Sequence, residues 1–262
     1  MTYNHWLCFL EAPKNRVPYF FRQCEGEYLA DLVLCNSLTQ RDALVQQTRC
    51  IPSMNYLKFK VLEPPVDEDL IIQYTSASDK FEQDLILFNH RLSLQSEYAE
   101  NLRNFAAIID TVKDAYPGLR VLFTNPSGYE IKDLKPWMQC TTLPRKDYIE
   151  LLAAKPLTCG LFSSKRMWSM SLSESNAFGG LSVVPSHSCF LEMYPINYQY
   201  FFSGGNLGEA RDKLIFLLKN PEVRIEHGKR LQNFVVKHFS NKIKAREVYK
   251  MLKDLVGGEH GN

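Results

Sequence analysis

Charged side chains follow two apolar runs of this sequence, and their positions indicate a ligand site. Arg91 stands just after the run Asp84–Asn89, and Lys165 and Arg166 follow the run Leu157–Phe162. Apolar runs of this length predict buried strands. In open α/β sheets, ligands bind where the carboxyl ends of strands meet helix N-termini. Cations at that edge suit an anionic group of a ligand.

The stretch 157–195 contains the most complete pattern of this kind. The Ser-rich segment Ser169–Glu174 predicts the start of a helix, and the pair Gly179–Gly180 predicts its end, because glycine takes the left-handed backbone conformation. A buried strand, Leu181–Pro185, and a loop ending at Glu192 come next. Strand, loop, short helix and strand form one βαβ unit, so we expect the chemistry in this stretch.

The rest of the chain alternates between apolar runs and amphipathic segments. This alternation predicts an α/β fold, a Rossmann-like doubly wound parallel sheet. Ser37 or Thr39 is the expected cap of the first helix, and residues 1–30 are expected to have mixed structure. The predicted strands are 32–35, 57–62, 84–89, 119–124, 138–143, 157–162, 181–185 and 198–202. The predicted helices are 40–47, 98–115, 146–154, 209–218, 222–238 and 241–255.

Composition excludes several classes of protein. The 262 residues are 45% hydrophobic and carry a net charge of +2, which is typical of a globular domain and too small to indicate nucleic-acid binding by itself. Seven scattered cysteines without a CxxC pair favour reduced thiols over disulfides or zinc. No apolar run is long enough to span a membrane, and no signal peptide is visible, so we expect a cytoplasmic protein. We expect no metal site, because Asp67–Asp69 is interpreted as a solvated connection.

Six stretches of the sequence form a recognisable series of motifs. They are Asp31–Ser37 with Gln40–Asp42, the "PPVD" connection in Val61–Asp67, Leu85–Phe88 with Arg91, Tyr116–Val121, the 157–195 block and Asn220–Glu222. GT-B glycosyltransferases carry these motifs in the same order, so residues 31–255 resemble that group, which includes retaining hexosyl- and mannosyltransferases, and chiefly its donor-binding domain. The resemblance implies a GT-B type fold and a nucleotide-sugar-dependent transferase of the EC 2.4 class.

The resemblance also implies a domain organisation. Residues 1–75 correspond to a shortened acceptor-side region with its connection, and residues 76–256 to the donor-binding domain. Residues 257–262 are a polar tail that we expect to be disordered. About 75 residues precede the donor domain, against the roughly 100–200 of a typical domain. We therefore expect either a truncated or split protein, or a second copy or a partner chain that supplies the acceptor surface.

Three residues are the catalytic candidates that the resemblance implies. Arg91 and Lys165 would neutralise the diphosphate of a UDP- or GDP-sugar, and Glu174 would hold the ribose hydroxyls; no cofactor is expected to be bound permanently. The other donor-binding candidates are Asn89, His90, Arg166, Trp168, Ser171, Ser173, Ser175 and Glu192.

Each candidate also has an ordinary structural interpretation. The arginines, Lys165 and the two glutamates suit a solvated surface, His90 and Trp168 suit packing, and the serines suit helix capping. Retaining members often carry Glu-x7-Glu in this region. With Glu174 as the second acid, Arg166 occupies the position of the first, and an alternative register places Ser175 at the second position. The lysine that usually follows the first-strand arginine has no counterpart here.

The acceptor is predicted from a narrower resemblance. Asn89–Arg91 with Trp168–Ser171 resembles bacteriophage glycosyltransferases that act on modified DNA bases. Residues 209–253 hold twelve Lys and Arg against five Asp and Glu, which is compatible with DNA and also with ordinary surface helices. The acceptor hydroxyl would then belong to a hydroxymethylated base, or alternatively to a glycan or lipid. The competing hypothesis is a non-catalytic, donor-domain-like binding subunit.

Overall fold

The chain divides into two compact units. The computed structural model describes residues 2–4, 27, 29–49, 58–76, 80–92, 96–124, 131, 134–162 and 168–258. The first unit, called here the small unit, comprises Met1–Pro65, Arg166–Trp168 and Asn241–Asn262. The second, the large unit, comprises Val66–Lys165 and Ser169–Ser240.

The small unit is built on a parallel sheet of order β1-β2-β3, formed by Thr2–Asn4, Val33–Cys35 and Phe59–Val61. Helix α2, Leu38–Thr48, follows β2 and begins where the Ser37 hydroxyl accepts a hydrogen bond from the Gln40 N–H at 3.1 Å. This contact confirms Ser37 as the cap. Helix α10, Asn241–Gly258, belongs to the same unit.

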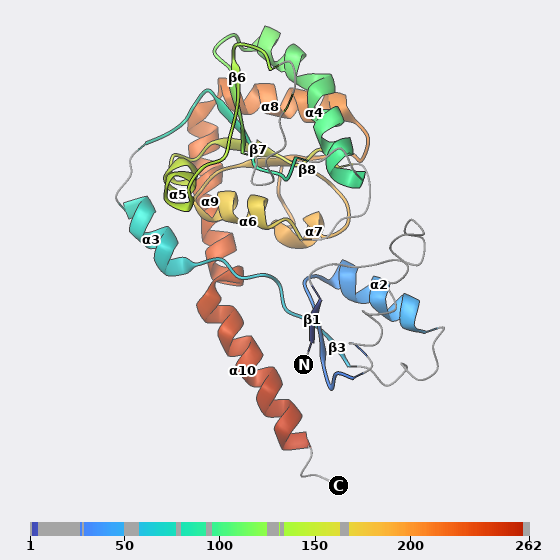
Figure 1. Cartoon of the computed structure of the whole chain (residues 1–262). Coiled ribbons are helices and arrows are strands. Elements are labelled where there is room, and N and C mark those ends of the chain that lie inside the picture. The colour runs from blue at the N-terminus through green and yellow to red at the C-terminus, as the bar shows by residue number, and fades with distance from the viewer. Residues whose placement is uncertain are drawn as a thin grey trace. The chain divides into compact units, whose positions relative to one another are not determined.

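The large unit is built on six parallel strands in the order β6-β5-β4-β7-β8-β9. The chain enters at the centre with β4, moves outward through β5 to β6, returns to the centre at β7, and leaves through β8 to β9 on the other side (Figure 1). This order confirms the predicted doubly wound sheet. The strands are β4 (Leu85–Phe88), β5 (Arg120–Thr124), β6 (Met138–Thr141), β7 (Leu157–Cys159), β8 (Ser182–Pro185) and β9 (Phe201–Phe202).

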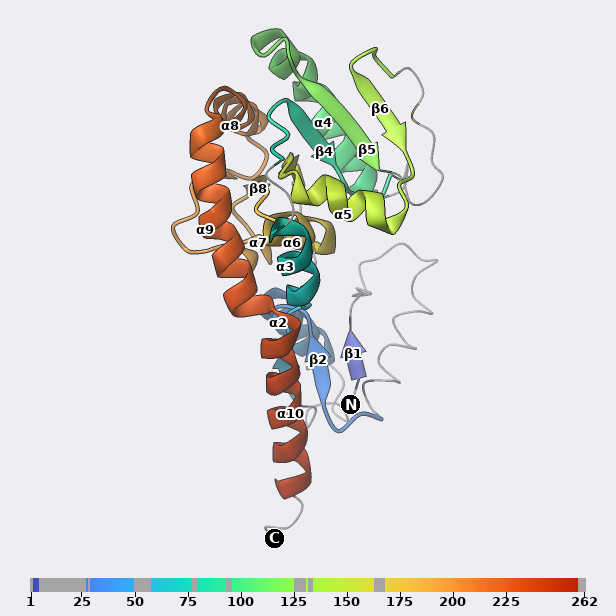
Figure 2. The ribbon, with the colours of Figure 1, turned by 90° about the vertical axis from the view of Figure 1, so that its left-hand side faces the viewer.

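Helices cover both faces of this sheet. Figure 2 shows α4 on one face of β4, β5 and β6, and α5 on the other. Helix α4 also packs against α8, and α6 packs against α9. The helices are α3 (Glu68–Ser76), α4 (Ser96–Ala115), α5 (Arg145–Ala153), α6 (Met170–Ala177), α7 (Phe190–Met193), α8 (Leu207–Lys219) and α9 (Pro221–Phe239).

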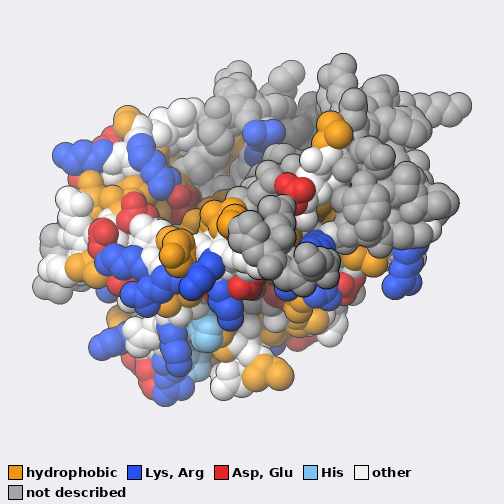
Figure 3. Space-filling view, turned by 90° about the horizontal axis from the view of Figure 1, so that it is seen from below, with side chains coloured by type: hydrophobic (Ala, Val, Ile, Leu, Met, Phe, Trp, Pro, Cys, Tyr) orange, Lys and Arg blue, Asp and Glu red, His pale blue; other side chains and the backbone are white. Residues whose placement is uncertain are grey.

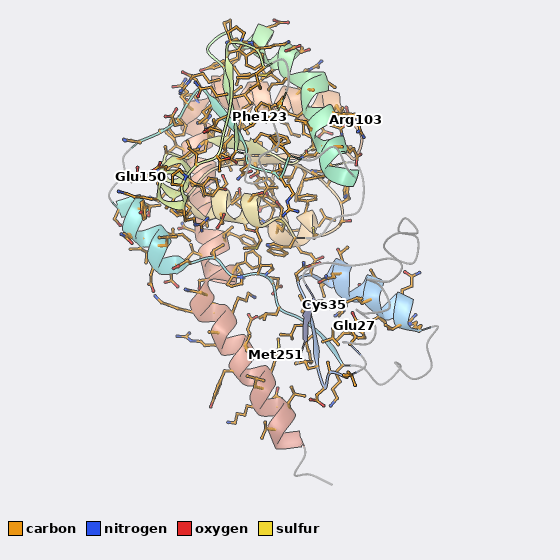
Figure 4. The ribbon with its side chains drawn as sticks, in the orientation of Figure 1. Glu27, Cys35, Arg103, Phe123, Glu150 and Met251 are labelled. Atoms are coloured by element: carbon orange, nitrogen blue, oxygen red, sulfur yellow. The ribbon has the colours of Figure 1, made fainter. Side chains whose placement is uncertain are left out.

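The core lies where the apolar stripe of α4 meets the central strands. All four residues of β4 are buried, as expected for a strand covered on both faces. The rings of Phe88, Phe105 and Phe123 form a cluster with centroids 5.0–5.7 Å apart, in tilted and edge-to-face arrangements. Figure 4 labels Phe123 on its strand within this core.

Several boundaries differ from the sequence-based predictions. Residues 68–76 form α3 instead of an irregular connection, because the Asp67 carboxylate accepts from the Leu70 N–H at 3.1 Å and acids in the first turn favour a helix N-terminus. Glu192 lies in the short helix α7 rather than in a loop. Gly257 and Gly258 continue α10, and residues 259–262 lie outside the described part. Strand β1 was not predicted. Most of residues 1–30 lie outside the described part of the chain.

Two glycines allow α6 and α9 to approach closely. Gly179 ends α6 with φ +88°, as the sequence predicted. A Cβ added at Gly228, in the middle of α9, would overlap the carbonyl oxygen of Gly179. Only glycine at position 228 therefore allows the two helices to approach each other this closely. Within the described residues, no helix is long and apolar enough to cross a membrane.

Arg224 fastens α9 to the segment that enters β4. Its side chain is almost completely buried, and its guanidinium donates hydrogen bonds to the carbonyl oxygens of Glu82 and of Gln83, the latter at 2.8 Å. The guanidinium also lies 4.2 Å from the centroid of the Phe81 ring. Burial lowers its pKa to about 10. A buried cation that satisfies two backbone carbonyls in this way tethers the central strand.

We predict that Arg224→Met lowers the free energy of unfolding by about 2 kcal/mol, because two buried carbonyls lose a charged donor while methionine keeps the side-chain length. Urea unfolding followed by circular dichroism measures the change. Arg230→Met is the matched control, since Arg230 lies exposed on the same helix and pairs with Glu226; its effect should stay within about 0.5 kcal/mol. Equal effects of the two substitutions would contradict this role.

Candidate functional site

The reversal of strand order between β4 and β7 defines the candidate site. Successive connections leave these two neighbouring strands toward opposite sides of the sheet. A crevice at the carboxyl ends of such strands is the usual ligand position in doubly wound sheets. Asn89, His90 and Arg91 follow β4 directly, and α6 begins in the connection that follows β7. The predicted residues of these two segments are therefore brought to one edge of the sheet.

Asn89 links three elements at this edge. Its amide Nδ2 donates to the carbonyl oxygen of Ser171 at 2.8 Å and to the Tyr148 hydroxyl at 3.2 Å. The end of β4 is thus tied to the first turn of α6 and to α5. Asn89 is 8% exposed, and its Oδ1 has no hydrogen-bond partner among the described residues. An unpaired buried acceptor at a proposed ligand edge marks a position where a donor group of a ligand would be favourable.

His90 is buried and uncharged. Its Nε2 donates to the carbonyl oxygen of Cys159 at 2.8 Å, so in the neutral ring Nδ1 is the acceptor, and it faces the Ser171 hydroxyl at 3.5 Å. The rings of Phe88 and Phe162 meet it edge-on. Burial lowers the pKa of His90 to about 4. Both ring nitrogens are used inside the protein, so His90 positions β7 and α6 rather than supplying charge to a ligand.

The N-terminus of α6 presents backbone donors that have no partner inside the helix. Ser169 is the N-cap residue, and its side chain makes no capping hydrogen bond. The first hydrogen bond of the helix runs from the Ser173 N–H to the Ser169 carbonyl at 3.0 Å, so the preceding N–H groups have no partner within the helix. These groups and the helix dipole form a site for an anion. The half-buried Ser171 hydroxyl lies in the same turn.

Two charged residues lie apart from the buried groups of this edge. Arg91 is exposed, and no ion pair or hydrogen bond of its side chain is found among the described residues. Glu174, one turn along α6, pairs with Arg145 at 2.7 Å between Nη2 and Oε1, with 25% of its side chain exposed. The hydrogen bond to Glu174 raises the pKa of Arg145. Arg91 therefore supplies an exposed cation, and Arg145 holds the carboxylate of Glu174 in place.

Arg145 and Tyr148 are site residues that the sequence analysis missed. Arg145 had a usable signal, because it begins the helix that follows β6 at the same edge of the sheet. Tyr148 had none, since it resembles any half-apolar residue of an amphipathic helix. Only the hydrogen bond from Asn89, 59 positions earlier in the sequence, identifies it. Burial raises the pKa of the Tyr148 hydroxyl, which therefore stays protonated.

Several predicted residues are not placed at the surface. Ser173, Ser175 and Trp168 are buried, with exposed fractions of 3%, 0% and 4%. Ser175 Oγ lies against Gly180, where a Cβ would approach it to 2.7 Å, so it faces the interior and not the ligand edge. We therefore leave these three out of the site and place Glu174, not Ser175, in it. Glu192 is half-buried on α7 after β8, and Lys165 and Arg166 lie outside the described residues.

Other features of the described residues do not suggest a second site. An open groove of about 610 Å³ lies along α8 and the residues before β9, and it contains none of the groups above. It is lined by Gln199, Tyr200, Asn206, Gly208, Glu209, Asp212, Lys213 and Phe216. Nowhere in the described ranges do three or more His, Cys, Asp or Glu residues come together so as to hold a metal ion.

Solved structures of known proteins share this fold. No protein-family model and no curated protein matches the sequence. A glycosyltransferase from Rickettsia africae has a TM-score of 0.67 at 12% identity, over 95% of this chain and 69% of its own. Sucrose-phosphate synthase from Thermosynechococcus elongatus has a TM-score of 0.71 at 11% identity, over 95% of this chain and 63% of its own. Anabaena HepE, in complex with UDP and glucose, has a TM-score of 0.69 at 14% identity, over 96% of this chain and 70% of its own.

These similar structures are GT-B glycosyltransferases, and the chain has an α/β fold of that type, as its sequence resemblance implied. The identities of 11–14% establish the fold and leave the activity to be inferred from the site. The chain spans only part of each of these proteins, between 63% and 70% of their lengths.

We predict that His90 makes the fold sensitive to acid. Its pKa is about 4 in the folded chain against an ordinary 6.5, so the unfolded chain binds more protons between these values. Stability is therefore complete above pH 6.5 and falls as the pH drops toward 4, by about 3 kcal/mol in all. Urea unfolding at a series of pH values measures the slope.

His90→Gln removes this titration while its amide can still donate to the Cys159 carbonyl, so its stability should depend less on pH in that interval. His238→Gln, on the exposed side of α9, is the matched control and should keep the wild-type slope. The same slope in His90→Gln and wild type would show that His90 is not buried as described.

Proposed function

We propose that the chain binds a nucleotide sugar at the β4–β7 edge and transfers its sugar to an acceptor hydroxyl. The observation that carries this proposal is the meeting of three groups at that edge: the exposed cation Arg91, the uncapped N-terminus of α6 and the partly exposed carboxylate of Glu174. A nucleotide sugar offers a matching diphosphate and ribose. The GT-B fold supports the proposal by analogy.

The diphosphate would bind at the start of α6. The free N–H groups of the first turn and the helix dipole favour an anion there, and Arg91 would add a charge-assisted hydrogen bond. The hydrogen bond from the Asn89 amide to the Ser171 carbonyl holds this turn against β4, so the donors need not reorganise when the ligand binds. Lys165, from the segment before α6, is proposed to complete the cation set.

The ribose would bind at Glu174. A carboxylate accepts hydrogen bonds from two adjacent hydroxyl groups, as the acid of dinucleotide-binding folds does. Only one oxygen of Glu174 pairs with Arg145, so the other remains available to a ligand. The ion pair fixes the rotamer of Glu174, which lowers the entropy lost on binding. A UDP-sugar is the first donor to test, because HepE, a protein of similar fold, binds UDP.

In the proposed reaction, the bond between the sugar anomeric carbon and the diphosphate breaks, and the bonding electrons leave with the diphosphate. The acceptor hydroxyl oxygen forms the new bond to that carbon and passes its proton to the departing diphosphate. Arg91 and α6 would stabilise the charge that develops on the leaving group, and the site would hold donor and acceptor in reacting geometry. We propose retention of the anomeric configuration, following the resemblance of the sequence.

The proposed acceptor is a hydroxymethylated base of phage DNA, with a glycan or lipid hydroxyl as the alternative. The sequence motifs Asn89–Arg91 and Trp168–Ser171 support the DNA acceptor. A non-catalytic binding subunit is the competing function, and it differs in a measurable way, since it would bind UDP without releasing it from a UDP-sugar. A partner chain or a second copy is proposed to supply the acceptor side.

We predict that Glu174 accounts for recognition of ribose. Isothermal titration should show that wild type binds UDP tighter than 2′,3′-dideoxy-UDP by about 10-fold to about 100-fold, because two hydrogen bonds to a charged acceptor are lost. Glu174→Ala should bind both ligands with nearly equal affinity. Glu150→Ala, an exposed acid of α5 labelled in Figure 4, should keep the wild-type preference. A preserved preference in Glu174→Ala would exclude this carboxylate from the ribose site.

We predict that Arg91 stabilises the leaving diphosphate. UDP release from UDP-sugars, with hydroxymethylated DNA, glycan or lipid as acceptor, should fall by about 100-fold in Arg91→Ala. Arg103→Ala is the matched control, because Arg103 is an exposed cation on α4 (Figure 4), and it should keep full activity. UDP binding by wild type without turnover on any acceptor would favour the non-catalytic subunit, and no binding of any nucleotide would refute the proposal as a whole.

A further inference from the structure

Helix α10 has two faces that differ in burial. Lys244 is buried, and Ile243, Glu247, Val248, Met251 and Leu255 are partly buried, so these residues form the inward face. Figure 4 labels Met251 on this helix. At about 100° per residue, they span less than half of the helix circumference. Lys244 pairs with Glu63 and with Glu247, each at 2.9 Å, so its charge is satisfied inside the small unit.

The opposite face carries an apolar strip. Ala245, Tyr249, Leu252 and Val256 follow one another at intervals of four, three and four residues, which places them in one line along the helix. All four are exposed; the values for Tyr249, Leu252 and Val256 are 70%, 41% and 65%. A surface helix normally exposes polar residues opposite its packed face. None of the described residues of the small unit covers this strip.

A basic strip lies directly beside the apolar one. Lys242, Arg246, Lys250 and Lys253 are exposed and repeat at intervals of four, four and three residues. The acids of α10 lie outside both strips. Glu247 pairs with Lys244, and Asp254 lies on the side of the basic strip that faces away from the apolar strip. Figure 3 shows one face of the molecule, on which Lys and Arg side chains lie next to hydrophobic side chains.

We propose that these two strips of α10 form a binding surface for an anionic lipid bilayer. The apolar strip would enter the boundary between headgroups and acyl chains, while the basic strip would contact lipid phosphates and carboxylates. Lysine and arginine stems lie along apolar surface and keep their charge in water, which suits this adjacency. Tyr249 has an apolar ring with a polar end, a residue type enriched at membrane interfaces.

The charges distinguish this occupant from two others. A second copy of the chain, docked on this face by a two-fold axis with antiparallel helices, would place its own basic strip beside this one, and like charges would repel. Duplex DNA would attract the basic strip but offers no apolar phase for Leu252 and Val256. An anionic bilayer complements both strips at once. This surface is separate from the proposed nucleotide-sugar site and does not depend on it.

Co-sedimentation of the whole chain with phospholipid vesicles tests the proposal. The chain should bind vesicles that contain phosphatidylglycerol and not vesicles of phosphatidylcholine alone, and binding should weaken as salt rises from about 0.05 M to about 0.5 M. The combined substitutions Arg246→Gln, Lys250→Gln and Lys253→Gln should lower the partition coefficient by about 100-fold. The combined substitutions Tyr249→Ser, Leu252→Ser and Val256→Ser should lower it also at high salt, where screening has removed the electrostatic part.

The matched charge control carries Lys219→Gln, Lys229→Gln and Lys237→Gln, three exposed lysines of α8 and α9, and should bind vesicles as wild type does. Thermal melting by circular dichroism confirms that each variant is folded. No sedimentation with anionic vesicles at low salt overturns the proposal. An equal loss of vesicle binding in both charge variants overturns it too. Binding of the chain to duplex DNA without binding to vesicles also overturns it. So does a dimer that dissociates when the apolar strip is replaced.

Discussion

The arrangement of this molecule depends on a parallel sheet that has to be buried on both faces. Parallel strands need crossover connections, and the large unit places these on both sides by starting at the centre, at β4, and returning there at β7. Because of this return, the connections that leave β4 and β7 run in opposite directions. The start of α6 therefore lies beside the end of β4. The Asn89 amide holds that junction through Ser171 and Tyr148. The candidate site follows from how the sheet is covered.

The electrostatics of the site follow from which groups the sheet buries. His90 and Asn89 lie at the carboxyl end of a fully buried strand, so their polar atoms are used to connect elements, and burial keeps His90 neutral. Arg91, one residue further on, has left the sheet and is exposed. Glu174 and Ser175 are neighbours on α6, yet a step of about 100° turns one toward solvent and the other toward Gly180. Charge is therefore available only where the backbone emerges from the core.

Helix α10 shows a different use of helical periodicity. Its inward face is partly buried, and there the charge of Lys244 is satisfied by Glu63 and Glu247. Its outward face combines exposed apolar and basic strips that the described residues do not cover. Exposure of this apolar strip to water is unfavourable, so a surface that covers it would be stabilising.

The sequence by itself determined the elements that local rules govern. Runs such as Leu85–Phe88 and Leu157–Cys159 predict buried strands, the stripe of α4 predicts a helix, Ser37 predicts a cap, and Gly179 predicts a helix end. Its motifs also indicated the GT-B type of fold. Helix α3 was missed because the acids of its first turn resemble a solvated connection, although Asp67 caps it.

Only the tertiary structure decided which side chains meet. Asn89 reaches Ser171 across 82 positions, and Arg145 reaches Glu174 across 29, and no periodic pattern encodes such pairs. They depend on strand order, which places β7 next to β4 although β5 and β6 lie between them in the sequence. Burial likewise separated Glu174 from Ser175 and made His90 a structural residue. The physical reason is that hydrogen bonds and desolvation depend on distance in space, and only the packed sheet sets that distance.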